Sequence, residues 1–520
     1  MLESPSVHRI LMAVGFALAL AIIATPTPLP AQDSPVPPEL RLGTLSFENS
    51  GSAAAQPAFE RGMLLLHSFE YGPAAEAFRE AQETDPDFAM AYWGEAMTHN
   101  HPVWMQQDRD AALVTLGRLA PTPAERAAKA GPAGGGTERE AAYLRAIDVL
   151  YGEGTKEERD DAYARTMREL HETYPEDEDA VAFYALALLG TAHEGRDFGT
   201  YMKSAGTLEM VVDEHPGHPG IAHYLIHSYD DPIHAPLGLR AARAYSEIAP
   251  DAAHAQHMTS HIFVALGMWD DVVSANENSM RVVNRDRTAR GLGSGACGHY
   301  NFWLEYGYLQ QGRNEDALRL LRECYDRVLE AAGGDAPDPD NTPIGSYAQM
   351  LSRYVVDSGE ADTPALDWPL DLSASPHAGF TMAFAKGWAA AEREEADGVR
   401  AAIDRARGLD ADLANAGGED DAWIQRRRVL LMELESRLRG LEGDGAGAVA
   451  LAREAAEAEA AMPFEFGPPF IDKPTYELLG EQLVEAAKPE EARAAFRTAL
   501  ARTPHRVAPE RGLAALDGDD

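Results

Sequence analysis

The sequence predicts an all-α fold built from stacked helical hairpins, and three observations carry this prediction. Small residues, large apolar residues and helix-ending prolines recur with a period of about 34 residues along most of the chain. No segment sustains the alternation of apolar and polar residues that a half-buried strand requires. The 520 residues are 45% hydrophobic and 25% charged, which is ordinary for a folded protein and argues against global disorder.

The repeat is clearest in three windows. Counting from Ala55 places its small, large and helix-ending residues at Gly62, Ala74, Phe78, Ala81 and Pro86. The count from Lys473 gives Leu479, Gly480, Ala492, Phe496, Ala499 and Pro504, and the count from Gly298 gives Tyr308, Gly312, Ala317, Leu321 and Cys324. In this pattern the windows resemble tetratricopeptide repeats. The resemblance implies two antiparallel helices per repeat, stacked into a superhelix whose concave groove is lined by the first helix of each repeat.

The remaining windows set the expected domain organisation. Further repeats tile the segments 185–218, 219–252 and 253–286, and weaker ones fit 89–120, 137–177, 376–410 and 421–460. Stretches rich in Gly, Pro or Asp interrupt the pattern. We therefore expect an N-terminal array over 51–331, a linker over 332–375, a C-terminal array over 376–506 and a flexible tail over 507–520.

The N-terminus is typical of a targeting segment. Arg9 precedes an apolar run over 10–24, and the small residue Ala31 comes before Gln32. This pattern predicts a signal peptide over 1–31, followed by a disordered or extended leader over 32–50. We expect an exported protein, periplasmic or secreted, that stays out of the membrane after cleavage; an uncleaved signal would act as an N-terminal anchor.

Charge and cysteine content exclude several function classes. The chain has 84 acidic and 45 basic residues, and a net charge of −39 opposes binding to nucleic acid or anionic lipid. Two cysteines cannot build a disulfide framework or a multi-cysteine zinc module. In an oxidising compartment Cys297 and Cys324 could pair, although their spacing alone leaves this open.

Histidines are concentrated at the positions that would line the groove. In the tetratricopeptide family these are the second, fifth, ninth, twelfth and thirteenth residues of each repeat, which share one helix face. Nine of the 13 histidines in six windows occupy these positions, whereas random placement would put roughly two there. The nine are His67, His101, His193, His223, His227, His254, His257, His261 and His299.

Two pairs among these histidines predict a metal site. His223 and His227 are four residues apart, as are His257 and His261, so each pair shares one helix face, and the pairs fall on adjacent repeats. Imidazole is a common ligand of zinc, copper and iron. Asp230 follows on the same face and would either add a carboxylate or orient a ring. We expect these five residues to bind a divalent transition metal, with one or two ions, and the other five groove histidines to contact a ligand.

Other interpretations stay open at this point. The groove could bind an acidic or aromatic peptide without metal, and His171, His215, His218 and His505 are expected to be structural. The segment 462–474 would cover the end of the superhelix or close the groove. No motif nominates a nucleophile, and the glycine-rich run at 291–298 is not preceded by a predicted strand. The hypothesis is an exported binding solenoid with a metal in its groove; the alternatives are a metalloenzyme and a metal-free scaffold for a protein or peptide partner.

Overall fold

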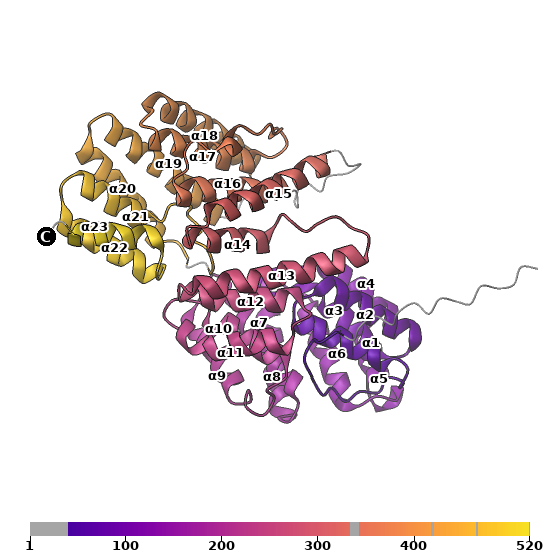
Figure 1. Ribbon diagram of the computed structural model, residues 1–520. Coiled ribbons are helices and arrows are strands. Elements are labelled where there is room, and N and C mark those ends of the chain that lie inside the picture. The colour runs from indigo at the N-terminus through magenta and orange to yellow at the C-terminus, as the bar shows by residue number, and fades with distance from the viewer. Residues whose placement is uncertain (1–39, 333–342, 418–420, 464–465, 519–520) are drawn as a thin grey trace, which may run out of the picture. The chain divides into compact units, whose positions relative to one another are not determined.

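A computed structural model describes residues 40–332, 343–417, 421–463 and 466–518, and most of these residues are helical (Figure 1). The predicted all-α fold class is confirmed. The one sheet in these ranges is a short antiparallel pair, β1 (Asn100–His101) and β2 (Gln106–Gln107), around the 3₁₀ turn η1 (Pro102–Trp104). Within the same ranges no helix is long and apolar enough to cross a membrane. The predicted signal peptide lies outside the described residues.

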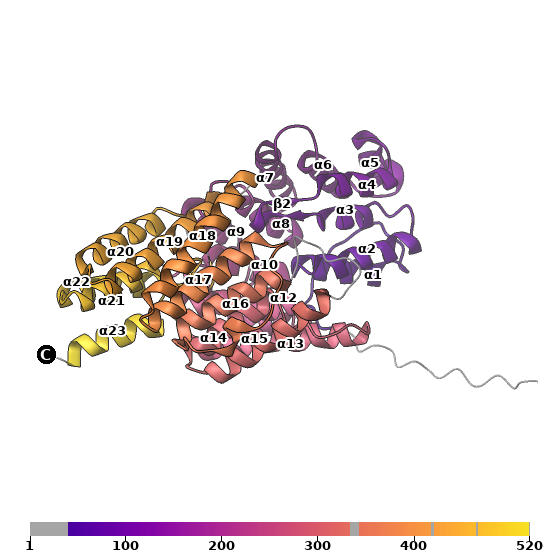
Figure 2. The same ribbon diagram turned by 90° about the horizontal axis from the view of Figure 1, so that it is seen from above.

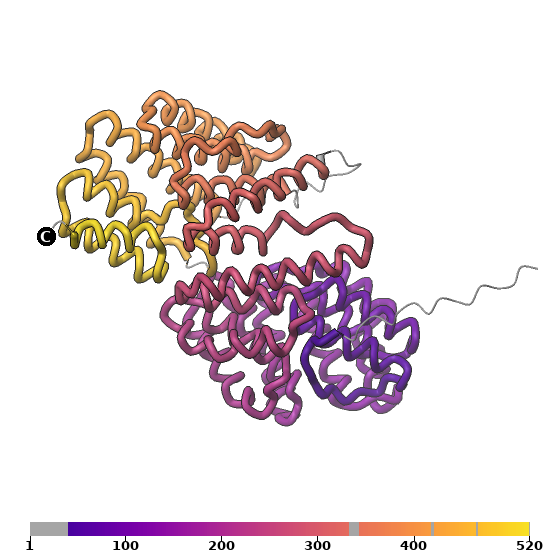
Figure 3. The backbone as a smooth tube through the Cα atoms, viewed as in Figure 1, coloured from indigo at the N-terminus to yellow at the C-terminus, as the bar shows by residue number. Residues whose placement is uncertain are grey.

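The helices follow one another as antiparallel hairpins, traced by the backbone tube in Figure 3. The first third of the chain contains α1 (Gln56–His67), α2 (Tyr71–Thr84), α3 (Ala89–Met97), α4 (Arg109–Leu119), α5 (Pro123–Ala130), η2 (Pro132–Gly134), α6 (Glu138–Leu150) and α7 (Lys156–Thr173). The middle contains α8 (Glu178–Leu189), α9 (Phe198–Glu209), α10 (Pro219–Tyr229), α11 (Ala235–Ile248), α12 (Ala253–Ala265), α13 (Trp269–Ala289), α14 (His299–Gln310) and α15 (Asn314–Ala332).

The last third continues the same arrangement. It contains α16 (Pro343–Ser358), η4 (Pro364–Asp367), α17 (Pro376–Glu392), α18 (Ala396–Ala416), α19 (Asp421–Leu441), α20 (Gly445–Ala460), α21 (Thr475–Glu485), α22 (Pro489–Arg502) and α23 (Val507–Gly518). Seen from above, α17 to α20 lie side by side as successive pairs (Figure 2).

Glycine opposite phenylalanine explains why the hairpins pack so closely. Phe78 of α2 lies between Gly62 of α1 and Gly94 of α3, where an added Cβ would meet ring atoms at 2.8 and 2.3 Å. Phe496 of α22 repeats the arrangement with Gly480 of α21, where the same distance is 2.4 Å. The absence of a side chain lets the backbones approach, and the large ring fills the space between three helices.

The structure places helices in two segments that the sequence predicted to lie outside the repeats. The segment 332–375, predicted as a linker, contains α16, whose Tyr347, Leu351 and Tyr354 are fully buried at helical spacing. Prolines and glycines on both sides of this helix obscured its apolar face. The segment 507–520, predicted as a flexible tail, contains α23, which packs against α21 and α22.

The buried apolar residues form two clusters, and the boundary between these clusters differs from the predicted boundary between the two arrays. One buried cluster runs from the extended leader to α14, and a second runs from α13 to α22. The second cluster includes α15 and α16, which the sequence placed in the first array and the linker. The described part of the leader is extended: Phe47 is buried, and the Thr44 amide donates to the carbonyl of Gly217 at 2.9 Å.

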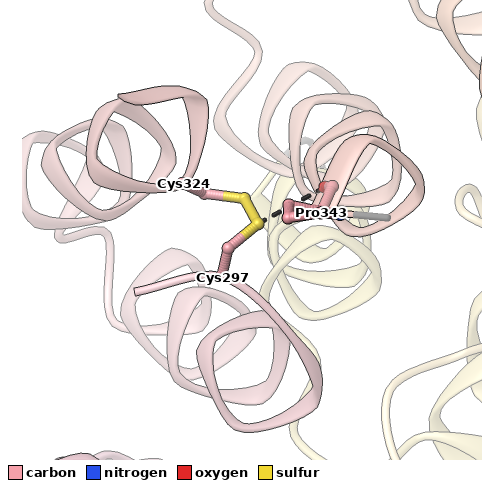
Figure 4. Close-up of a disulfide and its surroundings, with 3 residues drawn as sticks. All are labelled: Cys297, Cys324 and Pro343. Carbon is pink, nitrogen blue, oxygen red and sulfur yellow. Dashed lines mark hydrogen bonds between the residues drawn. A yellow bond between two sulfur atoms is a disulfide. The ribbon is translucent and has the colours of Figure 1, made fainter. Parts of the chain in front are cut away.

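The two cysteines form a disulfide, which resolves the question left open by their spacing. Cys297 lies in the loop before α14 and Cys324 lies in α15, with Cα atoms 4.5 Å apart (Figure 4). The Cys297 sulfur also lies 3.4 Å from the carbonyl oxygen of Pro343; because a disulfide sulfur carries no proton, this is a close contact. The bond ties the start of α14, where His299 lies, to the next helix.

Candidate metal centre

Six of the predicted groove histidines come together on three first helices of successive hairpins. The helices α10 and α12 pack against each other, and α14 opens the next hairpin. The histidines form two groups of three, and each group offers ligand atoms within 4.8 Å of one another. We call them the α10–α12 group (His223, His227 and His254) and the α12–α14 group (His257, His261 and His299).

The α12–α14 group is organised by hydrogen bonds at Nδ1. The Nδ1 atom of His261 lies 2.6 Å from a carboxylate oxygen of Asp230, and the Nδ1 atom of His257 lies 2.7 Å from Oδ1 of Asn276 on α13. The amide nitrogen of Asn276 donates to the Val272 carbonyl, so its oxygen faces the ring as an acceptor. Both Nδ1 atoms therefore carry the proton, and both Nε2 atoms present a lone pair.

These two lone pairs face each other. The Nε2 atoms of His257 and His261 are 3.2 Å apart. Two bare acceptors cannot form a hydrogen bond, so this contact requires either an additional proton or a cation between the rings. A tetrahedral zinc ion with Zn–N bonds of about 2.0–2.1 Å separates two of its nitrogen ligands by about 3.3 Å. The observed separation fits two ligands of one metal ion.

An additional proton is opposed by burial. Burial lowers the pKa of His257 well below its usual 6.5, and the neighbouring rings His299, His261 and His254 lower it further. His299 keeps solvent contact at the edge of the group. The pKa of His299 is lowered as well, because protein atoms displace water from around its ring. His257 and His299 thus favour the neutral imidazole at neutral pH, which is the form that binds metals.

The α10–α12 group is buried and lacks hydrogen-bond partners at Nε2. The Nδ1 atom of His223 donates to the backbone carbonyl of His67 at 2.7 Å, which leaves its Nε2 with a lone pair. The Nε2 atoms of His223, His227 and His254 have no partner among the described residues. Burial lowers the pKa of all three rings well below 6.5. The side chains are therefore neutral ligands with unsatisfied nitrogen atoms.

Aromatic side chains enclose both groups. The ring of Phe69 lies 4.3 Å from that of His223, and Trp303 of α14 lies 4.3 Å from His261, between ring centroids. Phe466 approaches His261 at 5.5 Å, and a Cβ at Gly467 would meet the Trp303 ring at 2.2 Å. The described part of the segment 462–474 therefore lies against the histidine wall, in the position of a groove-closing element.

A large cleft borders the histidine groups. Its volume is about 1110 Å³, and its wall includes Trp104, His193, Arg196 and Phe466. Trp104 contacts His254 at 6.2 Å between ring centroids, and Phe466 contacts His261, so two wall residues touch the two groups. Trp104 and Phe466 are therefore the wall residues through which the cleft adjoins the two groups.

The structure groups the predicted metal ligands differently from the sequence hypothesis. The pair His223 and His227 belongs to one group and the pair His257 and His261 to the other. His254 and His299, expected only as ligand contacts, complete the two groups. Asp230 takes the second of its two predicted roles, since it orients the ring of His261 through Nδ1.

Three predicted groove histidines lie outside both groups. His67 is satisfied at both nitrogens, with Asp179 at 2.7 Å from Nε2 and the Tyr224 hydroxyl at 3.0 Å from Nδ1. The ring of His101 stacks on Tyr71 at 4.0 Å and its Nε2 contacts the Thr98 carbonyl. His193 lies on the cleft wall, and its Nε2 is 3.5 Å from a carboxylate oxygen of Asp161.

Sequence reasoning missed a third buried cluster. His218, expected to be an ordinary structural residue, lies with Asp179 and His67 in a group of possible ligands. Its Nδ1 accepts the amide of Ile221 and so caps α10, and its Nε2 is 3.5 Å from Asp179. Both nitrogens of His67 have hydrogen-bond partners, whereas Nε2 of His218 and one carboxylate oxygen of Asp179 have none among the described residues. His218, Asp179 and Asn276 fall outside the groove positions of the repeat, so those positions selected only His67 of this cluster.

Comparison with known proteins gives similarity in solved structures alone. No protein-family model and no curated protein sequence matches the chain. The APC/C hetero-tetramer Cut9–Hcn1 is similar at 11% identity over 91% of this chain and 78% of that chain, with a TM-score of 0.33. Yeast Tom70 is similar at 11% identity over 89% and 95%, with a TM-score of 0.34.

The TPR domain of P58(IPK) is similar at 13% identity over 90% of this chain and 98% of that chain, with a TM-score of 0.21. The chain's own helices decide the fold: α10 and α12 begin at Pro219 and Ala253, one repeat length apart. Each is followed by an antiparallel partner helix, α11 or α13, that packs against it. The described chain is an all-α array of tetratricopeptide-type hairpins, as its sequence predicted.

Proposed function

We propose that the protein binds a divalent transition-metal ion at the α12–α14 group. One observation carries the proposal: the Nε2 atoms of His257 and His261 approach to 3.2 Å while both Nδ1 atoms donate hydrogen bonds elsewhere. His299 supplies a third imidazole within reach. A cation between these nitrogens turns a repulsive contact between lone pairs into two coordination bonds.

The donor set indicates the class of metal. Three imidazole ligands suit zinc, copper and iron better than magnesium or calcium, which prefer oxygen ligands. Three protein ligands leave a coordination position for water or a further ligand, as in catalytic rather than purely structural zinc sites. Asp230 holds His261 by its other nitrogen and so fixes the orientation of that ligand. The same arrangement serves a metal carrier or a metalloenzyme.

The setting of the site supports an exported binding protein. The disulfide between Cys297 and Cys324 favours an oxidising compartment, in agreement with the signal peptide predicted over 1–31. The net charge of −39 attracts metal cations rather than acidic partners. We therefore propose a periplasmic or secreted protein that holds a metal ion in the groove of its repeat array.

A second candidate function is a metal-free scaffold for a protein or peptide partner. The cleft of about 1110 Å³ supports it, because its volume admits a peptide segment next to the aromatic wall. The two candidates differ in one respect: a scaffold binds its partner equally well after the metal is removed.

Elemental analysis tests the proposal. The mature protein is treated with chelator, reloaded separately with zinc, copper and iron, and freed of unbound metal by gel filtration. We expect stoichiometric retention of at least one metal, and loss of at least one ion per chain in the variant His257→Ala/His261→Ala. The exposed His505→Ala serves as the matched control and should bind as the unchanged protein does. Circular dichroism checks that each variant is folded. Absence of bound metal in every reloaded sample would overturn the proposal.

A further inference from the structure

We infer that the α10–α12 group binds a second metal ion, which makes the histidine cluster a two-metal centre. The inference rests on the proposed function of the α12–α14 group and adds a separate site on a different pair of helices. The two groups have no ligand in common, because α12 contributes His254 to one and His257 and His261 to the other.

The first argument is the state of the nitrogens. Each Nε2 of His223, His227 and His254 is buried without a partner in the described part of the chain. A buried polar group without a hydrogen bond destabilises the folded state, and buried groups of this kind are uncommon in folded proteins. Three of them lie with ligand atoms within 4.8 Å, so one bound ion satisfies all three. Ligands of one ion lie about 3.3 Å apart, and small side-chain rotations close the difference.

The second argument is that aromatic side chains hold these rings in place. Phe69 lies in the turn between α1 and α2, with the same left-handed backbone (φ of 52°) that Gly267, Glu394 and Ala487 adopt in the turns of other hairpins. Its ring contacts His223, His227 and His254, with centroids at 4.3, 5.6 and 5.6 Å. Tyr245 of α11 stacks on His223 from another side. Aromatic packing therefore holds the three rings of this group together.

The third argument concerns charge. The ring centroids of His227 and His261 are 5.9 Å apart, and those of His254 and His257 are 6.0 Å apart, so the two groups are contiguous. Two divalent ions in one buried cluster carry four positive charges. Asp230 and Glu70 are the adjacent carboxylates, engaged by the His261 ring and the His254 amide. The centre therefore takes a small anionic oxygen ligand from solution, and hydroxide fits because a bound zinc ion lowers the pKa of water to about 7.

Stoichiometry distinguishes one ion from two. The full mature chain is titrated with zinc alone by calorimetry, and the metal content is measured after gel filtration. We expect two zinc ions per chain in the unchanged protein and one in His227→Gln, which keeps a side chain of similar size. His261→Gln should also retain one ion, while His193→Gln, which lies outside both groups, should retain two.

Each outcome has a distinct meaning. A single ion in the unchanged protein, kept in His227→Gln and lost in His261→Gln, would overturn this inference and leave the proposed function intact. No ion in any sample would overturn the proposed function itself. Where a variant does not fold, the unchanged protein loaded with two equivalents of copper(II) gives the answer by electron paramagnetic resonance. Coupled copper spectra are expected, and spectra of isolated copper alone would contradict the two-metal centre.

Discussion

The partner of each Nδ1 atom decides what these histidines can do. His261 meets a carboxylate, His257 meets an amide oxygen and His223 meets a backbone carbonyl. Each partner fixes the proton on Nδ1 and leaves Nε2 free for a metal. The sequence predicted the ring positions through helical spacing. It did not predict the partners Asn276 and the His67 carbonyl, because they come from elements outside the groove face.

The role of Asp230 leads to a prediction at this scale. Replacing Asp230 by Asn removes the negative charge that supports the His261 imidazole. We expect zinc affinity at the α12–α14 group to fall by about 10- to 100-fold, with the fold retained. Competition titration against a chelator of known affinity measures the effect. Asp213→Asn changes an exposed carboxylate paired with Arg240 and should leave the affinity unchanged. Equal affinity in the two variants would contradict the assigned role.

A buried glutamate outside the metal centre predicts a pH dependence. Glu433 of α19 is fully buried, and both its oxygens lack partners among the described residues. Burial raises its pKa well above the usual 4.5, and the carboxylates of Glu459 and Asp472 raise it further, against the opposing effect of Lys473 and Arg426. The folded state therefore favours the protonated form.

Because the pKa is raised on folding, the contribution of Glu433 to the free energy of unfolding is fully present below pH 4.5. This contribution is lost as the pH rises through the folded-state pKa. Between pH 4.5 and the folded-state pKa, the free energy of unfolding falls by about 1.4 kcal/mol per pH unit. We expect Glu433→Gln to unfold at a higher temperature than the unchanged protein at pH 8, with a difference that shrinks toward pH 5. Thermal unfolding over this range measures it, with Glu435→Gln on the same helix as control. A constant difference at all pH values would contradict the assignment.

At the scale of helices, the contact between glycine and phenylalanine sets the hairpin spacing. Replacing Gly94 by Ala would place a Cβ within 2.3 Å of the Phe78 ring. We expect a loss of roughly 1–3 kcal/mol in unfolding free energy, since overpacking forces the ring or the backbone to move. Chemical denaturation measures the change.

Gly72 of α2 is the matched control for this prediction. Apart from its chain neighbours and the adjacent backbone of α2, no atom lies within 4 Å of a Cβ added there, so Gly72→Ala should be neutral or slightly stabilising. If the two variants were equally stable, close packing at Phe78 would not explain the repeat's glycines.

The helices show which parts of the fold the sequence could predict. The 34-residue period located the hairpins that keep its strict spacing, such as α10–α11 and α12–α13. It failed for α16 and α23, which depart from the period and take their stability from packing. Tyr347 and Tyr354 of α16 are fully buried, and Arg506, just before α23, is held by Asp357 and Glu477. These long-range contacts join residues up to 149 positions apart, so no local pattern reveals them.

For the whole molecule, the sequence predicted that histidines line one wall but did not predict how they divide. The grouping depends on how α10, α12 and α14 are rotated about their axes and on the offset between repeats. The groove positions of the repeat pattern determine neither of these. The ring of His227 thus faces its own group and lies 5.9 Å from His261 of the other. The sequence also left the pairing of the two cysteines undecided, because only the packing of α14 against α15 brings Cys297 to Cys324.

A structure with metal bound tests the central claim most directly. Crystals of the mature protein loaded with zinc are measured at the zinc absorption edge, and anomalous difference density locates each ion without ambiguity. We expect a peak about 2.0–2.1 Å from the Nε2 atoms of both His257 and His261, with Asp230 still bound to the far side of the His261 ring. Anomalous maps without a peak between these two nitrogens, in protein shown to be folded and zinc-saturated, would contradict the account.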